Sequence, residues 1–318
     1  MPLRAMMKGV QRASQLLLIG SWLALFGVAH AQAIVRVLLA DVPAAVVSFD
    51  GPHRGHIDGR AFDTPHALTW PVAAVADRLW VDGHDVGVAL DLTADEGVVW
   101  DGRRYRGVLR FAARDGRVRI INVVDVESYL RGVVPAEMQA SWPTEALKAQ
   151  AVAARTYTLH HLDGRRDYDV CATVKCQVYR GRDAEHPLAD AAIAATEGEV
   201  LTYEGAFART YYHADSGGVI ASAAEVWGAD LPYLQAFQDV AHAGPHSNWV
   251  VALEPRAVGA HLAAAGVAVG SLQRLRILET SSSGRVTRAE VVGSAATAVL
   301  TGATLRSQLR AWGLKSTR

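Results

Sequence analysis

One glutamate stands between two prolines in a segment dense in polar and small residues. The segment, residues 131–157, reads RGVVPAEMQASWPTEALKAQAVAARTY. Glu137 follows Pro135 closely, and Pro143 comes before an alanine-rich stretch that contains two cations. A carboxyl group at a break between two helices can be a solvated surface group, a helix cap or an acid positioned for proton transfer.

The two cations of the alanine-rich stretch are Lys148 and Arg155. At about 100° per residue, their spacing puts them about 20° apart around a helix axis, next to its apolar face. They can contact oxygens of a substrate from one stripe. Alternatively, they are solvated cations, with Lys148 paired to Glu145. Spacing alone does not decide between these interpretations.

A Ser-Gly-Gly sequence further on suggests a second kind of chemistry. HADSGGVI contains the Asp-Ser-Gly-Gly order of a chymotrypsin-like nucleophile segment. In that fold the catalytic histidine precedes the serine by roughly 140 residues. Here His160 and His161 precede Ser216 by only 56 and 55 residues, and the chain has no G-x-S-x-G elbow. The pattern therefore disfavours a serine hydrolase, and Gly217 and Gly218 indicate close backbone approach to another segment or to a ligand.

The first 31 residues have the layout of a secretory signal peptide. Three basic residues open the segment, an apolar run covers Leu16 to Val28, and Ala29-His30-Ala31 makes an A-x-A cleavage site. The run is short for a membrane span, and an uncleaved anchor is the alternative. We expect an exported protein of the periplasm or cell envelope, with mature regions at 32–104 and 105–318.

The charge balance bears on the kind of partner. Without the three basic residues of the predicted signal segment, 29 basic residues face 32 acidic ones. A near-neutral chain argues against nucleic acid or another polyanion as the main partner.

Two cysteines, Cys171 and Cys176, lie in DVCATVKCQVY. In an exported protein we expect them to form a disulfide, which would shape the turn leading into Gln177 and Tyr179. The alternatives are free thiols or a zinc site completed by His160, His161 or His213. The spacing lacks the usual C-x-x-C form, so we expect no metal and no other cofactor.

Short alternating segments fill residues 34–124, with a hairpin turn at Asp115-Gly116. A helix is expected from an Asp125 N-cap to Gly132, ending before Pro135. The next helix follows Pro143 and meets no breaker until Gly164. Its expected buried face consists of Leu147, Ala151, Ala154, Thr158 and Leu162.

The remaining chain predicts a short helix within 186–198 and a hairpin turning at Glu204-Gly205. Helices near 256–265 and 303–312 flank two strands, 272–280 and 284–293. The whole pattern is typical of an α+β protein, mostly antiparallel strands, with a helical insertion that carries the active site.

Several stretches in order resemble one family. They are NVVDVESYLRGVVPAEMQASWPTEALKAQAVAARTYTL, DVCATVKCQVYRG, YYHADSGGVIASAAEVWG, LPYL and GATLRSQLRAWGLKST. They look like the stage II sporulation protein D / LytB (amidase enhancer) family, and the resemblance runs from about Tyr105 to Arg318. Lys175 stands where the family often has histidine, which weakens the zinc alternative.

The resemblance implies a lytic transglycosylase that cleaves peptidoglycan glycan strands, some of them stripped of stem peptides. The family's catalytic glutamate falls on Glu137, and its helix cations fall on Lys148 and Arg155. We also assign Gln177, Tyr179, Ser216, Gly217 and Gly218 to substrate binding. A non-catalytic glycan-binding enhancer of a cell-wall amidase, or a structural envelope protein, would fit the same resemblance.

A single carboxyl suffices for this reaction. Ordinary glycoside hydrolysis uses two carboxyls. In lytic transglycosylation the C6 hydroxyl of the sugar attacks C1 instead of water, so one carboxyl can protonate the leaving oxygen and then accept the C6 proton. Apolar surroundings favour the protonated form of such an acid. Apolar candidates near Glu137 in the sequence are Val133, Val134, Pro135, Met138 and Trp142.

Overall fold

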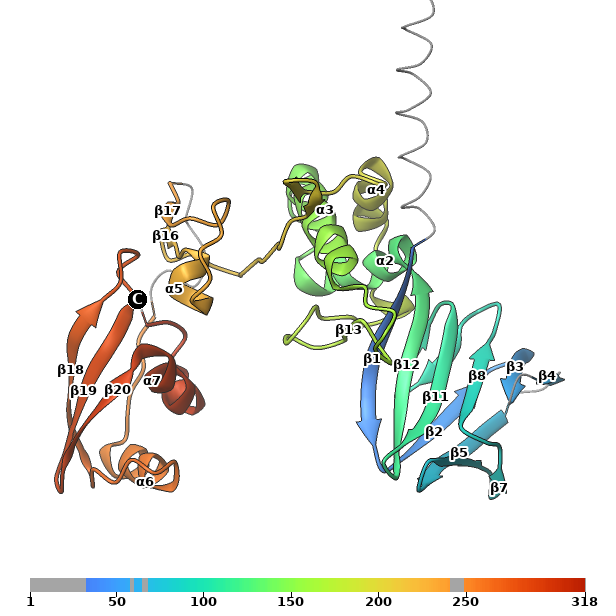
Figure 1. Ribbon diagram of the computed structural model, residues 1–318, viewed down its shortest axis with the longest axis horizontal. Coiled ribbons are helices and arrows are strands. Elements are labelled where there is room, and N and C mark those ends of the chain that lie inside the picture. Colours follow the sequence, from blue (N-terminus) through green and yellow to red (C-terminus); the bar gives the residue numbers. More distant parts are fainter. Residues whose placement is uncertain (1–32, 58–59, 65–67, 241–248, 318) are drawn as a thin grey trace, which may run out of the picture. The chain divides into compact units, whose positions relative to one another are not determined.

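The computed structural model describes residues 33–57, 60–64, 68–240 and 249–317 (Figure 1). The predicted signal segment lies outside this described part. Among the described residues, no helix is both long and apolar enough to cross a membrane. The chain divides into two compact units, one ending at Tyr211 and one starting at Tyr212. Residue 104, where the sequence suggests a boundary, therefore falls inside the first unit.

Two mostly antiparallel sheets form the strand-rich part of the first unit. The larger has the order β13-β1-β12-β11-β8-β3-β4 and the smaller the order β10-β9-β2-β5-β6-β7. The larger contains β13 (Val170–Cys171), β1 (Ile34–Val42), β12 (Arg117–Asp125), β11 (Val108–Arg114), β8 (Ala89–Thr93), β3 (His53–Ile57) and β4 (Arg60–Thr64). The smaller contains β10 (Arg103–Tyr105), β9 (Val98–Trp100), β2 (Ala44–Phe49), β5 (Leu68–Val75), β6 (Arg78–Val81) and β7 (His84–Asp85).

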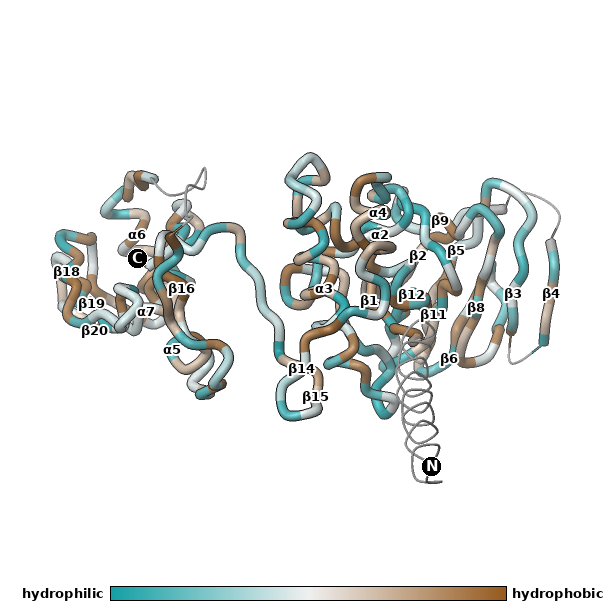
Figure 2. The backbone as a smooth tube through the Cα atoms, turned by 90° about the horizontal axis from the view of Figure 1, so that it is seen from above, coloured by the Kyte–Doolittle hydropathy of each residue, from teal (hydrophilic) through white to brown (hydrophobic). Residues whose placement is uncertain are grey.

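Alternation of apolar and polar residues explains how these sheets pack (Figure 2). Successive side chains of a strand point to opposite faces of the sheet, so every second residue reaches the core. One buried cluster draws on both sheets, with Val47 and Leu79 from the smaller one and Leu92, Phe111 and Ile120 from the larger one. The mixed α+β class and the mostly antiparallel pairing predicted from the sequence are confirmed.

The predicted hairpins are also confirmed. β11 and β12 pair in antiparallel register around Asp115 and Gly116, whose φ angles are 52° and 71°. β14 (Thr202–Tyr203) and β15 (Ala206–Phe207) pair around Glu204 and Gly205. A two-residue turn with positive φ at both positions matches the right-handed twist of its strands, and glycine at the second position reduces the strain.

Three helices pack against β1 and β12 near Val35 and Val124. They are α2 (Val126–Glu137), α3 (Thr144–His161) and α4 (Pro187–Ala195). Asp125 caps α2 by accepting from the backbone N–H of Ser128 at 2.9 Å, as the sequence predicts. A second core cluster joins these helices to Val35 and Val37 of β1.

The predicted end of α2 before Pro135 is wrong. The helix continues through Pro135 to Glu137, and the N–H of Met138 still donates to the carbonyl of Val134 at 3.0 Å. A proline lacks only its own amide donor, and this one stands in the last turn, where one hydrogen bond is lost and packing compensates for it. Glu137 is therefore the last residue of the helix.

A buried ion pair fastens the segment before β13 to β1. Asp169 accepts from the backbone N–H of Arg36 at 2.8 Å and from its guanidinium at 2.8 and 3.1 Å. The N–H of Asp163 donates to the same carboxyl at 2.9 Å. β13 then runs parallel to β1 and leads into the cysteine loop.

We expect acid to weaken the first unit as Asp169 becomes protonated. Burial alone would raise the pKa of Asp169, but the hydrogen bonds from Arg36 and the backbone amides outweigh it and hold this pKa below its usual value. A lowered folded-state pKa gives stability that is complete above the unfolded pKa of about 3.9 and is lost as the pH falls through the folded value. Between about pH 6 and about pH 3, the free energy of unfolding measured in urea should fall less in Asp169→Asn than in the wild type. Equal losses in both proteins would contradict this role.

The second unit has a sheet of three antiparallel strands, β18 (Leu272–Thr280), β19 (Val286–Gly293) and β20 (Thr297–Thr301). Its core lies between this sheet and the helices α6 (Pro255–Ala264) and α7 (Gly302–Leu309), which a 3₁₀ turn, Arg310–Trp312, follows. The helix α5 (Ala223–Trp227) and the short pair β16 (Val219–Ile220) and β17 (Phe237–Gln238) complete it. The two strands and two helices predicted for this region are present.

Candidate active site

Glu137 is half-buried at the C-terminal end of α2. Its Oε1 accepts a hydrogen bond of 2.5 Å from the backbone N–H of Val178. Within the part of the chain that the structure describes, Oε2 has no hydrogen-bond partner. The carboxyl is therefore fixed through one oxygen, while the other oxygen remains available to hold or transfer a proton.

Apolar residues surround the end of α2 on the core side. Val133 and Val134 are fully buried, and Met138 packs against the same cluster. Trp142, in contrast, is 46% exposed. Trp142 therefore presents an aromatic surface to solvent five residues after Glu137, and an exposed aromatic face of this kind can stack on a sugar ring.

Gln177, which the sequence assigns to substrate binding, lies in the core. It is fully buried, and its Oε1 accepts from the hydroxyls of Thr158 at 3.0 Å and Tyr129 at 3.3 Å. Its amide nitrogen donates to the carbonyl of Ala154 at 3.4 Å. Gln177 therefore joins α2, α3 and the loop that carries Val178.

Tyr179 is likewise a core residue, 2% exposed. Its hydroxyl donates to Oδ1 of Asn122 at 2.7 Å. Burial raises the pKa of Tyr179 above its usual value, so the phenol remains a donor. Tyr179 therefore has an internal partner, and its predicted contact with substrate stays a prediction.

Arg155 also has an internal role. Its side chain is 1% exposed, and its guanidinium donates to both carboxylate oxygens of Glu127 at 2.6 and 2.7 Å. It also donates to the carbonyls of Ile193 at 3.3 Å and Glu199 at 3.2 Å. In this arrangement the donors of Arg155 hold α2, α3 and the end of α4 together, and its contact with substrate stays a prediction.

Lys148 remains partly accessible, with 33% of its side chain exposed. Its ammonium lies 2.8 Å from Oε1 of Glu145, so it forms the ion pair with Glu145 that the sequence allows as one of two alternatives. An exposed pair of this kind contributes little to stability and opens easily. Lys148 is therefore more accessible to a ligand than Arg155, whose side chain is 1% exposed.

Ser216, Gly217 and Gly218 belong to the second compact unit, whereas Glu137 belongs to the first. Within its unit Ser216 is 5% exposed and donates to Asp239 at 2.7 Å, and its own hydroxyl accepts from the N–H of Gly218. Both glycines have positive φ, 67° and 94°. The double glycine thus serves a local backbone turn, and its predicted place in a glycan groove stays a prediction.

Cys171 and Cys176 are joined in a disulfide with a Cα–Cα distance of 5.4 Å. Sulfurs bonded to each other cannot act as the two thiolate ligands that zinc would need. Among the described residues, no three His, Cys, Asp or Glu side chains are close enough together to hold a metal ion. The disulfide instead closes the loop that leads to Gln177 and Val178.

Gln150 is a buried polar residue that the sequence patterns do not identify. It lies on α3 one turn before Ala154 and is 7% exposed, yet its amide nitrogen has no partner within the described ranges. Burying an unpaired amide donor costs free energy. Glutamine in the middle of an alanine-rich helix carries no special signal, so only burial identifies it.

A cavity of about 710 Å³ lies elsewhere in the first unit. Residues 49–52, 94–97 and 182–183 and Arg104 line it, and none of them is a predicted site residue. Its position is therefore different from that of Glu137. We place the candidate site at Glu137, because this is where a held carboxyl with an available oxygen is found.

Comparisons with known proteins address the segment around Glu137. Residues 114–203 match the family described as Stage II sporulation protein (SpoIID). An uncharacterized protein of Brachyspira hyodysenteriae is 36% identical over 211 residues, which cover 64% of this chain and 57% of that protein.

Two Bacillus proteins are also similar. The Amidase enhancer of Bacillus subtilis is 37% identical over 155 residues, 48% of this chain and 21% of that protein. Stage II sporulation protein D of Bacillus amyloliquefaciens is 32% identical over 130 residues, 36% of this chain and 38% of that protein. This chain therefore spans less than two thirds of the length of each of these relatives.

Proposed function

We propose that this chain, whose residues 114–203 match the SpoIID family, is a cell-wall lytic transglycosylase with Glu137 as its single acid and base. The proposed substrate is the glycan strand of peptidoglycan. The proposed site of action is the periplasm or cell envelope, which the layout of residues 1–31 favours.

The observation that carries this proposal is the asymmetric setting of the Glu137 carboxyl. With Oε1 accepting from Val178, a proton on Oε2 can be delivered to the glycosidic oxygen as the bond from C1 to that oxygen breaks. The C6 hydroxyl then attacks C1, and its proton returns to Oε2. The bond broken and the bond formed balance, no water is consumed, and the acid is regenerated. The scheme needs no metal or other cofactor.

A second candidate function is stimulation of a cell-wall amidase without glycan cleavage. The similarity to a protein named Amidase enhancer favours it. So does the internal use of Arg155, whose donors are engaged within the fold. Under this alternative, Lys148 and Trp142 would bind glycan, and Glu137 would be a polar residue held at a helix end.

Digestion of purified sacculi separates the two functions. The mature protein alone, incubated with intact and with stem-stripped sacculi, is expected to release 1,6-anhydromuramoyl products detectable by mass spectrometry. If anhydro ends never form, while an added cell-wall amidase becomes faster in the presence of the protein, the enhancer function replaces the enzyme. The comparison of the two substrates also reports the preferred glycan form.

A further inference from the structure

We infer that residues 177–185 form a strap that lets the N-terminal strands hold the Glu137 carboxyl in place, with Tyr179 as its positioning residue. This inference rests on the proposed function for its catalytic consequence. The strap runs from the disulfide loop to the start of α4, and it contacts the helices, β12 and residues 96–106, which precede the SpoIID match.

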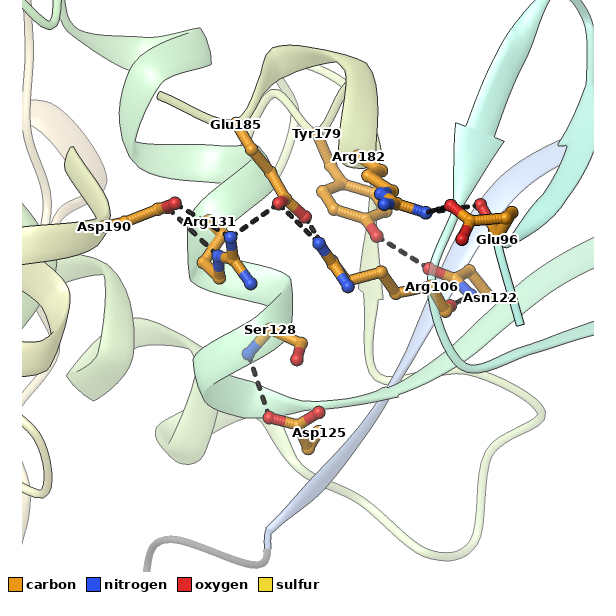
Figure 3. A network of polar contacts seen from close by, with 10 residues as sticks. All are labelled: Glu96, Arg106, Asn122, Asp125, Ser128, Arg131, Tyr179, Arg182, Glu185 and Asp190. Atoms are coloured by element: carbon orange, nitrogen blue, oxygen red, sulfur yellow. Dashed lines mark hydrogen bonds and ion pairs between the residues drawn. The ribbon is translucent and has the colours of Figure 1, made fainter. Parts of the chain in front are cut away.

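The strap begins at the catalytic carboxyl. The N–H of Val178 donates to Glu137. The next side chain, Tyr179, enters the core and donates to Asn122 on β12 (Figure 3). Asn122 is fully buried and donates in turn to the carbonyls of Arg106 at 2.8 Å and Val108 at 3.1 Å. Val178 is therefore one residue away from a hydrogen-bonded chain that ends on the backbone of the β-sheet.

The helix that carries Glu137 touches the same strap. A Cβ atom at Gly132 would lie 2.5 Å from a ring carbon of Tyr179, so only glycine allows α2 to approach the ring this closely. The N–H of Arg180 donates to the carbonyl of Gly132 at 3.2 Å. Both partners of the bond between Glu137 and Val178 are thus positioned against the Tyr179 ring.

The far end of the strap is tied to the N-terminal strands. Gly181 has a φ of 69°, and a Cβ there would lie 2.4 Å from the carbonyl oxygen of Arg104. Beyond it, three contacts join the strap to the strands and their loops. Arg182 donates to Glu96 at 2.9 Å, and Asp183 accepts from the N–H of Arg104 at 2.7 Å. Glu185 pairs with Arg106 at 2.5 Å.

Glu185 also joins the strap to α2. Its carboxylate lies 2.8 Å from Arg131, which in turn pairs with Asp190 of α4 (Figure 3). Glu185 is only 11% exposed, so water screens these pairs less than surface pairs. The strap is therefore held at both ends and in the middle.

These contacts give the N-terminal strands a role in catalysis without a substrate contact. Glu96, Arg104 and Arg106 all precede residue 114, where the family match begins. A proton transfer needs the donor and acceptor within hydrogen-bond reach, and small displacements of the acid reduce the rate. Loosening the strap should therefore slow the chemical step while glycan binding stays intact.

Tyr179→Phe tests this inference, because it removes only the hydroxyl that reaches Asn122. We expect kcat to fall about 10- to 100-fold with little change in KM, as expected for a displaced catalytic group. The amide proton of Val178, hydrogen-bonded to the Glu137 carboxyl, should also change its NMR chemical shift. Thr196→Val is the control, since it deletes another buried hydroxyl, hydrogen-bonded at 2.9 Å to Ala192, in a residue outside the strap. It should leave kcat and the Val178 resonance unchanged.

An unchanged kcat together with an unchanged Val178 resonance in Tyr179→Phe would overturn the inference. If this variant does not fold, Arg182→Gln takes its place, because Arg182 pairs with a Glu96 side chain that is 80% exposed. A shifted Val178 resonance then supports the strap, and an unshifted one rejects it. The NMR readout needs no turnover, so failure of the strap can be told apart from failure of the proposed enzyme activity.

Discussion

Replacing Glu137 with glutamine should abolish the release of anhydro-muropeptides from sacculi. The glutamine carbonyl can still accept the hydrogen bond from Val178, so the fold and glycan binding should persist. Its amide cannot deliver a proton to the leaving oxygen or take one from the C6 hydroxyl. A positioned acid or base contributes about 10²–10⁴-fold to a rate, and Glu137 has both roles, so the loss should reach the upper end of that range.

The matched control is Glu145→Gln, which changes the same functional group eight residues away. Glu145 is 82% exposed and its known partner is Lys148, so this variant should keep most of the activity. Turnover is measured by mass spectrometry of released muropeptides, and binding by co-sedimentation with sacculi. Near wild-type turnover by Glu137→Gln would show that another group supplies the proton.

Arg155→Ala should destabilise the first compact unit strongly. Removing one partner of a buried ion pair leaves the other charge uncompensated and costs about 3–5 kcal/mol. Glu127 is 19% exposed and regains some hydration, so the lower end of that range is expected. The carbonyls of Ile193 and Glu199 lose a donor as well. Calorimetry should then show a fall in Tm on the order of 10 °C.

Two further variants identify the cause of that loss. Arg165→Ala removes a guanidinium that is 91% exposed and pairs only at the surface, so its Tm should stay close to that of the wild type. Arg155→Met combined with Glu127→Met removes both charges and fills the space, and it should regain part of the lost stability. A stable Arg155→Ala protein with impaired glycan binding would instead restore the substrate contact predicted from the sequence.

Local chemistry in the sequence was sufficient for most secondary structure. The Asp125 side chain caps α2, and two-residue turns at Asp115-Gly116 and Glu204-Gly205 select the predicted hairpins. The apolar spacing of α3 correctly places Leu147, Ala151 and Ala154 in the core. Each of these features depends on neighbours within a few residues, which the sequence displays directly. The end of α2 could not be predicted this way, since packing of the last turn compensates for Pro135.

The candidate site shows where local patterns stop being informative. The sequence determines that Glu137 stands near a helix end with apolar neighbours, and it pairs Lys148 with Glu145 as one of two possibilities. The partner of Glu137 is the backbone of Val178, 41 residues later. A backbone N–H carries no sequence signal, so only the tertiary structure could identify this contact.

Long-range packing determined the partners of the polar residues that the sequence assigns to substrate binding. Arg155 meets Glu127 across 28 residues, and Tyr179 meets Asn122 across 57. From sequence, a polar side chain on a helix or loop fits either a ligand or a buried internal partner, because both satisfy the same donors. The choice depends on which segments fold against it. Burial of an unpaired charge or donor is costly, so in this protein the fold itself supplied the partners for Arg155, Gln177 and Tyr179 and left the carboxyl of Glu137 with an oxygen available.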